Sequence, residues 1–137
     1  MVLAAVAVAV YTSSGQGQTA QETRRPAVVV PVANEPSAKV YVDPPRPGPL
    51  ASGRVIIPYR TANLKLVPVF GPAALDVSPR IGHIHVTVDD NPWRWADTSG
   101  EPVIINGLSK GPHKIMIELV DANHMTLDQG VVNFVIP

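Results

Sequence analysis

Short runs in which apolar and polar residues alternate fill most of the chain after residue 53. The clearest run is Gly82–Asp89, where Ile84, Val86 and Val88 alternate with histidine, threonine and aspartate. A period of two is typical of a β-strand with one apolar face and one polar face. Other runs rich in valine, isoleucine and leucine predict further strands at 54–59, 64–70, 102–105, 113–121 and 131–136.

Turn-forming residues separate these runs, most clearly at Asn106-Gly107 and Gly111-Pro112. A single helical turn is expected at 72–75, and no long stretch carries the apolar stripe of an amphipathic helix. About seven short strands with such turns predict one all-β domain, an antiparallel β-sandwich of the immunoglobulin type. A small barrel is the alternative.

The start of the chain has a different pattern. Met1–Val10 is almost wholly apolar. This is too short for a membrane span, which needs about 20 residues, but typical of the apolar part of a signal peptide. We expect residues 1–20 to be a signal peptide or its remnant, and the protein to be periplasmic or extracellular. No basic residue precedes the run, and Gln18 stands where a small residue is preferred. A misassigned start and a short strand are therefore the alternatives.

Proline recurs throughout residues 21–52. Proline fixes φ and removes a backbone donor, so we expect an extended tether that forms neither a helix nor a central strand. Two valine-rich runs, Val28–Val30 and Val40–Val42, could each add an edge strand to the domain. The domain itself is expected to occupy residues 53–137.

Composition excludes several classes of function. The 137 residues suffice for one domain, and the 11 basic and 11 acidic residues give a formal net charge of zero. This balance argues against a nucleic-acid partner and against a polybasic membrane patch. The mature chain is expected to contain no membrane span. With no cysteine, the chain has no disulfide, no thiolate metal site and no cysteine nucleophile.

The four histidines all fall between residues 83 and 124. His83 and His85 share the face of their predicted strand that lies opposite its apolar residues. Two neighbouring imidazoles can form half of a zinc or copper site. Either His124, after the longest strand, or His113, at the start of that strand, would complete it. The last two lie at opposite ends of the strand, so one compact site is not expected to use both.

Two further readings bear on these histidines. Met125 could add a thioether ligand for copper(I), although it could equally be a loop hydrophobe. The histidines could also be structural, with Asp89, Glu118 or Asp121 as hydrogen-bond partners.

Trp93 and Trp95 are the only tryptophans, and they lie in a segment between two predicted strands. They could form a stacking platform for a sugar or another planar ligand, or shield a metal from solvent. Alternatively, one of them caps the end of the sandwich. The sequence has no nucleophile elbow and no phosphate-binding glycine loop, so we do not expect an enzyme.

The histidines belong to an ordered pattern, Gly-His-x-His-x-x-x-Asp, then Gly-x-His, then Asp-x-x-His. The segments GHIHVTVDDNPWRW, GLSKGPHKIMIELVDANHMTLDQGVVNF and NLKLVPVFGPA contain or accompany it. With this pattern, residues 53–137 resemble small exported bacterial proteins of unknown function with an immunoglobulin-like β-sandwich. The resemblance implies export, a β-sandwich and a metal-related role, the last by analogy with periplasmic copper-handling sandwiches.

Together these observations indicate an exported, non-catalytic binding module whose ligand is copper or zinc. The main alternative is a structural or adhesion module that contacts a protein or glycan through its edge strands and the Trp93/Trp95 loop. Edge strands could also mediate self-association. Replacing His83 and His85 by alanine would abolish metal binding under the first hypothesis and leave partner binding intact under the second.

Overall fold

The computed structural model describes residues 34–137, and almost all of its regular structure is β. The expectations for Met1–Val10 and Val28–Val30 lie outside the described residues. The elements are β1 (Lys39–Val42), α1 (Pro47–Ala51), β2 (Arg54–Ile57), β3 (Tyr59–Ala62), β4 (Lys65–Leu66), η1 (Pro72–Asp76), β5 (Ile81–Val88), β6 (Trp95–Asp97), β7 (Val103–Asn106), β8 (Gly111–Asp121) and β9 (Thr126–Ile136).

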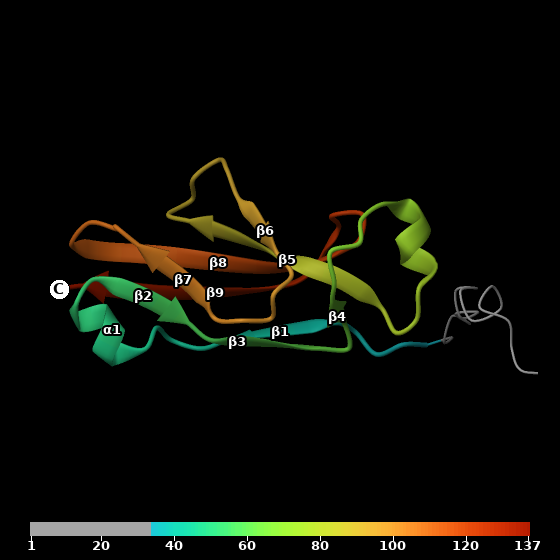
Figure 1. Ribbon diagram of the computed structural model, residues 1–137, viewed down its shortest axis with the longest axis horizontal. Coiled ribbons are helices and arrows are strands. Elements are labelled where there is room, and N and C mark those ends of the chain that lie inside the picture. Colours follow the sequence, from blue (N-terminus) through green and yellow to red (C-terminus); the bar gives the residue numbers. More distant parts are fainter. Residues whose placement is uncertain (1–33) are drawn as a thin grey trace, which may run out of the picture.

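The strands form two layers (Figure 1). One layer is a five-stranded sheet in the order β4-β5-β8-β9, with β6 also paired to β5. The other contains the pairs β1-β3 and β2-β7. All pairs are antiparallel except β4-β5. This all-β arrangement is the predicted sandwich, and over residues 34–137 the sheets do not close into the alternative barrel. The immunoglobulin-like topology stays a prediction.

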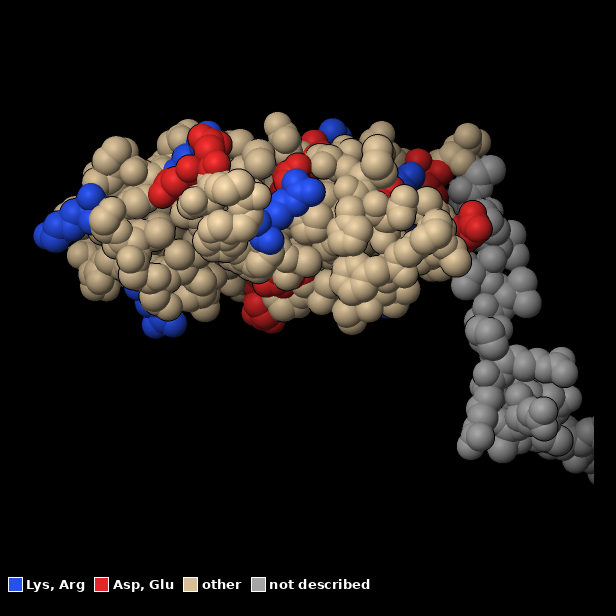
Figure 2. Space-filling view, turned by 90° about the horizontal axis from the view of Figure 1, so that it is seen from above, with Lys and Arg blue, Asp and Glu red and all other residues tan. Residues whose placement is uncertain are grey.

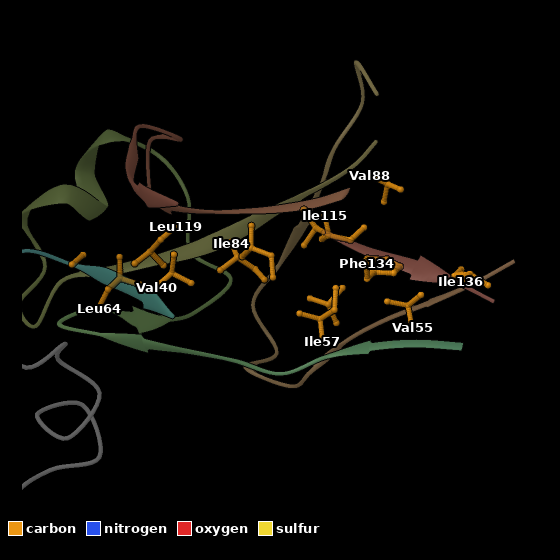
Figure 3. Packing of buried hydrophobic residues seen from close by; sticks show 14 residues of the cluster. Val40, Val55, Ile57, Leu64, Ile84, Val88, Ile115, Leu119, Phe134 and Ile136 are labelled. Atoms are coloured by element: carbon orange, nitrogen blue, oxygen red, sulfur yellow. The ribbon is translucent and has the colours of Figure 1, made fainter. Parts of the chain in front are cut away.

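The core lies between the two layers (Figure 3). The five-stranded sheet supplies Ile84, Ile115 and Leu119 from one side, and β2 supplies Val55 and Ile57 from the other. All five side chains are fully buried. Complete burial of one such aliphatic side chain contributes about 1.5–3 kcal/mol, so this interface dominates the stability of the fold.

β5 is the central strand of the structure. β8 pairs with one of its edges, while β4 and β6 pair with successive parts of the other. The predicted alternation is confirmed: Ile84, Val86 and Val88 belong to the core. His83 and His85 therefore project from the opposite face, away from the second layer.

The segment that was expected to be a tether packs against the domain where it is described. Ala38 and Val40 are core residues, and β1 pairs with β3. This is the added edge strand that the sequence left open, and the folded unit therefore begins before residue 53. The prediction that residues 21–52 contain no helix was wrong, because α1 starts at Pro47. Proline is tolerated in the first turn, where its missing N–H would have no helical partner.

Other boundaries also differ from the prediction. β6 lies in the tryptophan segment, where no strand was expected, and β9 starts at Thr126 rather than at residue 131. The early part of β9 was not predicted because it contains Gly130, and glycine usually weakens a strand. In the structure, Val42 packs onto Gly130, and a Cβ there would lie 2.5 Å from a Val42 methyl carbon.

Two surface properties agree with the composition. Charged side chains of both signs are scattered over the face seen in Figure 2, and neither sign gathers into a large patch there. Among residues 34–137, no helix has the length and apolar character needed to cross a membrane.

The close approach of β5 and β8 depends on Gly82. A Cβ at this position would lie 2.1 Å from the backbone oxygen of Val120, which cannot move without displacing β8. We expect Gly82→Ala to lower the free energy of unfolding by about 1–3 kcal/mol or more, as overpacking does elsewhere. Urea denaturation measures this loss.

Gly48→Ala is the matched control for that substitution. Gly48 lies in α1 with a negative φ and nothing within 4 Å of the added Cβ. Alanine is the better helix former, so no loss of stability is expected. Equal loss in the two variants would contradict the role assigned to the contact between β5 and β8.

Candidate metal centre

Three of the four histidines converge in the structure. The Nε2 atom of His83 lies 3.1 Å from Nε2 of His85 and 3.2 Å from Nδ1 of His124. The third side, between Nδ1 of His124 and Nε2 of His85, is also 3.2 Å. One nitrogen from each ring thus occupies a corner of a nearly equilateral triangle, and the three residues are hereafter called the three-histidine cluster.

β5 supplies two of these rings because residues two apart share a face of a strand. His83 is 0% exposed and His85 is 6% exposed. The segment between β4 and η1 contributes to this burial, since the Phe70 ring lies edge-on to His83 with a centroid distance of 4.9 Å. The backbone N–H of Gly71 donates to the carbonyl of Ala122, which ties this segment to the β8–β9 turn.

His124 comes from that turn and is exposed. The Asp121 carboxylate shapes the turn, because its Oδ1 atom accepts the N–H groups of Asn123 at 2.8 Å and Met125 at 2.9 Å. His124 itself has a φ of 66°, in the left-handed region. Few non-glycine residues adopt this conformation, though histidine does so more often than most. The turn thereby brings the His124 ring beside the two rings of β5.

The triangle has the dimensions of a metal-binding site. Zinc lies about 2.0–2.1 Å from each imidazole nitrogen, so tetrahedral ligands are separated by about 3.3–3.4 Å, and planar trigonal ligands by about 3.5–3.6 Å. Separations of 3.1, 3.2 and 3.2 Å are closer to the tetrahedral value. The three nitrogens can therefore hold a metal ion as three corners of a tetrahedron.

Without a cation, the same triangle is poorly satisfied. A ring nitrogen carries either one proton or one lone pair, so three converging nitrogens cannot all pair with one another. Nδ1 of His83 and Nδ1 of His85 are also buried and have no hydrogen-bond partner among the described residues. Buried polar atoms without partners cost free energy. A metal ion would use the lone pairs that face the centre.

The electrostatic environment keeps the buried rings neutral. Burial lowers the pKa of His83 to about 4, and the His85 and His124 rings add to this effect. Burial and then the nearby Arg94 guanidinium lower the pKa of His85. Neutral imidazole is the form that binds a metal, so at neutral pH no proton has to leave either buried ring.

A charged group lies next to the cluster on β8. Glu118 pairs with His85 in the register of β5 and β8, and it is buried. Its Oε2 atom lies 3.2 Å from Nη1 of Arg94, and its Oε1 atom accepts the Thr126 hydroxyl at 3.1 Å. The carboxylate is therefore held by its own partners beside the cluster.

His113, the alternative third ligand, lies elsewhere. It opposes Phe134 near the start of β8, whereas His83 opposes Val120 near the end. Its Nδ1 atom is 2.7 Å from the Asp89 carboxylate, and its Nε2 atom is 2.8 Å from the Ser109 carbonyl. Both partners are acceptors, and they raise the pKa of His113, the Asp89 hydrogen bond most strongly.

The two tryptophans differ in their surroundings, and a role for Trp93 in binding a ligand stays a prediction. Trp95 begins β6 and packs against the core, as a capping residue would. Trp93 is 58% exposed, and its ring centroid is 5.9 Å from that of Trp95 with a tilt of 31°. Met125 is exposed.

Phe70, Arg94 and Glu118 surround the cluster, but no sequence pattern predicted that any of them would lie at a metal site. Glu118 was expected only as a possible hydrogen-bond partner of structural histidines. The position of Phe70 beside the cluster depends on the path of the segment after β4, which no local sequence pattern predicts. Arg94 stands between two tryptophans. Its proximity to Glu118 depends on β6 and β8 both flanking β5.

Comparison with known proteins places the chain in a family. Residues 1–137 match the model of a family of unknown function (DUF6130), so the chain belongs to that family. The match includes residues 1–52, which the resemblance noted in the sequence did not cover. No curated protein and no solved structure matches the chain.

The opposite pKa shifts predict opposite pH effects on the stability of the metal-free protein. His83 titrates near 6.5 when unfolded and near 4 when folded, so the unfolded chain binds more protons between these values. The free energy of unfolding should therefore fall as pH drops from 6.5 towards 4. For His113, the folded pKa is raised. The contribution of His113 to the free energy of unfolding is complete below pH 6.5 and is lost as pH rises through its pKa in the folded protein.

Urea denaturation of chelator-treated protein between pH 4.5 and 8 measures both effects. The stability difference between wild type and His113→Gln should shrink as pH rises above 6.5. NMR titration of the ring nitrogens reports each pKa directly. His83 and His113 titrating at the same pH would contradict this assignment.

Proposed function

We propose that the protein is an exported, non-catalytic module that binds a copper or zinc ion through His83, His85 and His124. The observation that carries this proposal is the triangle of ring nitrogens, with sides of 3.1, 3.2 and 3.2 Å. A group of this kind is a candidate metal site on geometry alone. The three converging nitrogens cannot all pair with one another, and a metal ion at their centre would use the lone pairs that face it.

The donor set favours particular metals. Imidazole nitrogen suits zinc, copper, iron and nickel, whereas magnesium and calcium prefer oxygen. Zinc accepts the nearly tetrahedral arrangement of three nitrogens without a preference of its own. Copper binds nitrogen sites more tightly than zinc does. We therefore take copper and zinc as the two metals to test.

The contacts of three acidic residues in the domain, two of them near the cluster, fit a binding role better than an enzymatic one. Glu118 pairs with Arg94, Asp121 accepts backbone N–H groups of its own turn, and Asp89 pairs with His113. Each of these three carboxylates thus has a structural partner. Export is supported by the apolar run Met1–Val10, whose length is typical of a signal peptide.

The test is a calorimetric titration of the chelator-stripped full chain with copper(II) and zinc(II) at pH 7.5 and 5.5. We expect binding of one ion per chain at both pH values, because the lowered pKa of His83, about 4, leaves this ligand neutral across the range. Removing a residue that only supports a metal ligand lowers metal affinity by roughly 10- to 100-fold. His124→Asn removes a ligand itself, so it should lower the metal affinity by at least that factor. Asparagine tolerates the left-handed conformation, so this variant should fold.

His113→Asn is the matched control. It also replaces a histidine by asparagine, but at a position outside the three-histidine cluster, so the metal affinity should not change. Absence of binding by the wild-type chain would refute the proposal. So would an equal loss of affinity in His124→Asn and His113→Asn.

A further inference from the structure

The three-histidine cluster leaves a bound metal ion with an unfilled coordination position. Among the described residues, His83, His85 and His124 are the only group of three or more histidines, aspartates or glutamates whose possible ligand atoms all lie within 4.8 Å of one another. Zinc in proteins takes four ligands. Copper(II) takes a tetragonal arrangement of at least four. Three protein ligands with an open fourth position are typical of sites where the metal meets an external ligand.

The two carboxylates nearest to the cluster are held by other partners and do not fill the open coordination position. Glu118 binds Arg94 through Oε2 and Thr126 through Oε1. Asp121 binds the N–H groups of two turn residues through Oδ1. Moving either carboxylate onto the metal would break these contacts. An external ligand faces no such cost.

Access to the cluster lies on the side of His124. This ring belongs to an exposed residue, whereas the rings of β5 are buried against the sheet. Phe70 is 51% exposed and lies on the same side, with its ring parallel to that of His124 at a centroid distance of 5.9 Å and edge-on to His83. The phenyl ring narrows the approach, which favours a ligand of few atoms.

The charges at the site favour an anion. Three neutral imidazoles leave the two positive charges of the metal ion uncompensated. The guanidinium of Arg94 lies 3.2 Å from Glu118, the residue that opposes His85 on β8. Its charge offsets that of Glu118, and the single charge of Asp121 cancels only part of the two charges of the metal ion, so the site still attracts an incoming negative charge.

We infer that the metal ion in the three-histidine cluster takes a small external anion as its fourth ligand, with Arg94 neutralising the charge of the neighbouring Glu118. This inference rests on the proposed metal-binding function. The ligand is a compact anion with one donor atom directed at the metal, such as hydroxide, azide or a short carboxylate. Phe70 limits its size, and the solvent-facing side of His124 admits it.

Titration of the copper(II)-loaded full chain with sodium azide tests the inference. Azide that binds copper(II) directly produces a charge-transfer absorption absent from both components. We expect this absorption to saturate at one azide per copper. Arg94→Gln should weaken azide binding by roughly fivefold, the factor that about 1 kcal/mol of charge interaction provides, without changing the copper stoichiometry.

Lys110→Gln is the control for loss of one positive charge. Lys110 precedes β8, whereas the three-histidine cluster lies at the other end of that strand, so azide affinity should be unchanged. A wild-type chain that binds no copper would overturn both this inference and the proposed function. A chain that binds one copper but shows no azide absorption would overturn this inference alone. Equal azide affinity in Arg94→Gln and Lys110→Gln would overturn the role of Arg94.

Discussion

The burial of β5 on both faces is the constraint on which the rest of the structure depends. All eight residues from Ile81 to Val88 are buried, and both edges of the strand are paired. On one face the residues are aliphatic and hold the two layers together. On the other face, two imidazoles are removed from water without partners for their Nδ1 atoms. The stabilisation on the first face offsets the cost on the second.

That second face is covered by two segments far apart in the sequence. The segment containing Phe70 lies against the histidine rings, and the β8–β9 turn supplies His124. The hydrogen bond from Gly71 to Ala122 joins the two segments. The geometry of the cluster is therefore a property of tertiary packing, although two of its members come from one strand.

The sequence alone predicted the parts that depend on short-range periodicity. The alternation in residues 82–89 located β5 and placed His83 and His85 on one face. The choice between His113 and His124 needed the register of β5 against β8, which sets Gly82 opposite Asp121 and which no local pattern encodes. The packing of β1 was obscured by the prolines around it. Lys39–Val42 itself contains none, so its backbone donors are intact.

The division of the three histidines between a rigid strand and an exposed turn would have a kinetic consequence for the proposed metal site. His83 and His85 cannot leave a bound ion without disturbing the core strand, whereas His124 can swing away with a short hairpin turn. Local opening of a turn requires far less free energy than global unfolding. In the proposed site, the metal could therefore exchange while His83 and His85 still hold it and the sandwich stays folded. If the cluster holds a metal as proposed, the buried pair would contribute most to its retention, and the turn would control how fast it enters and leaves.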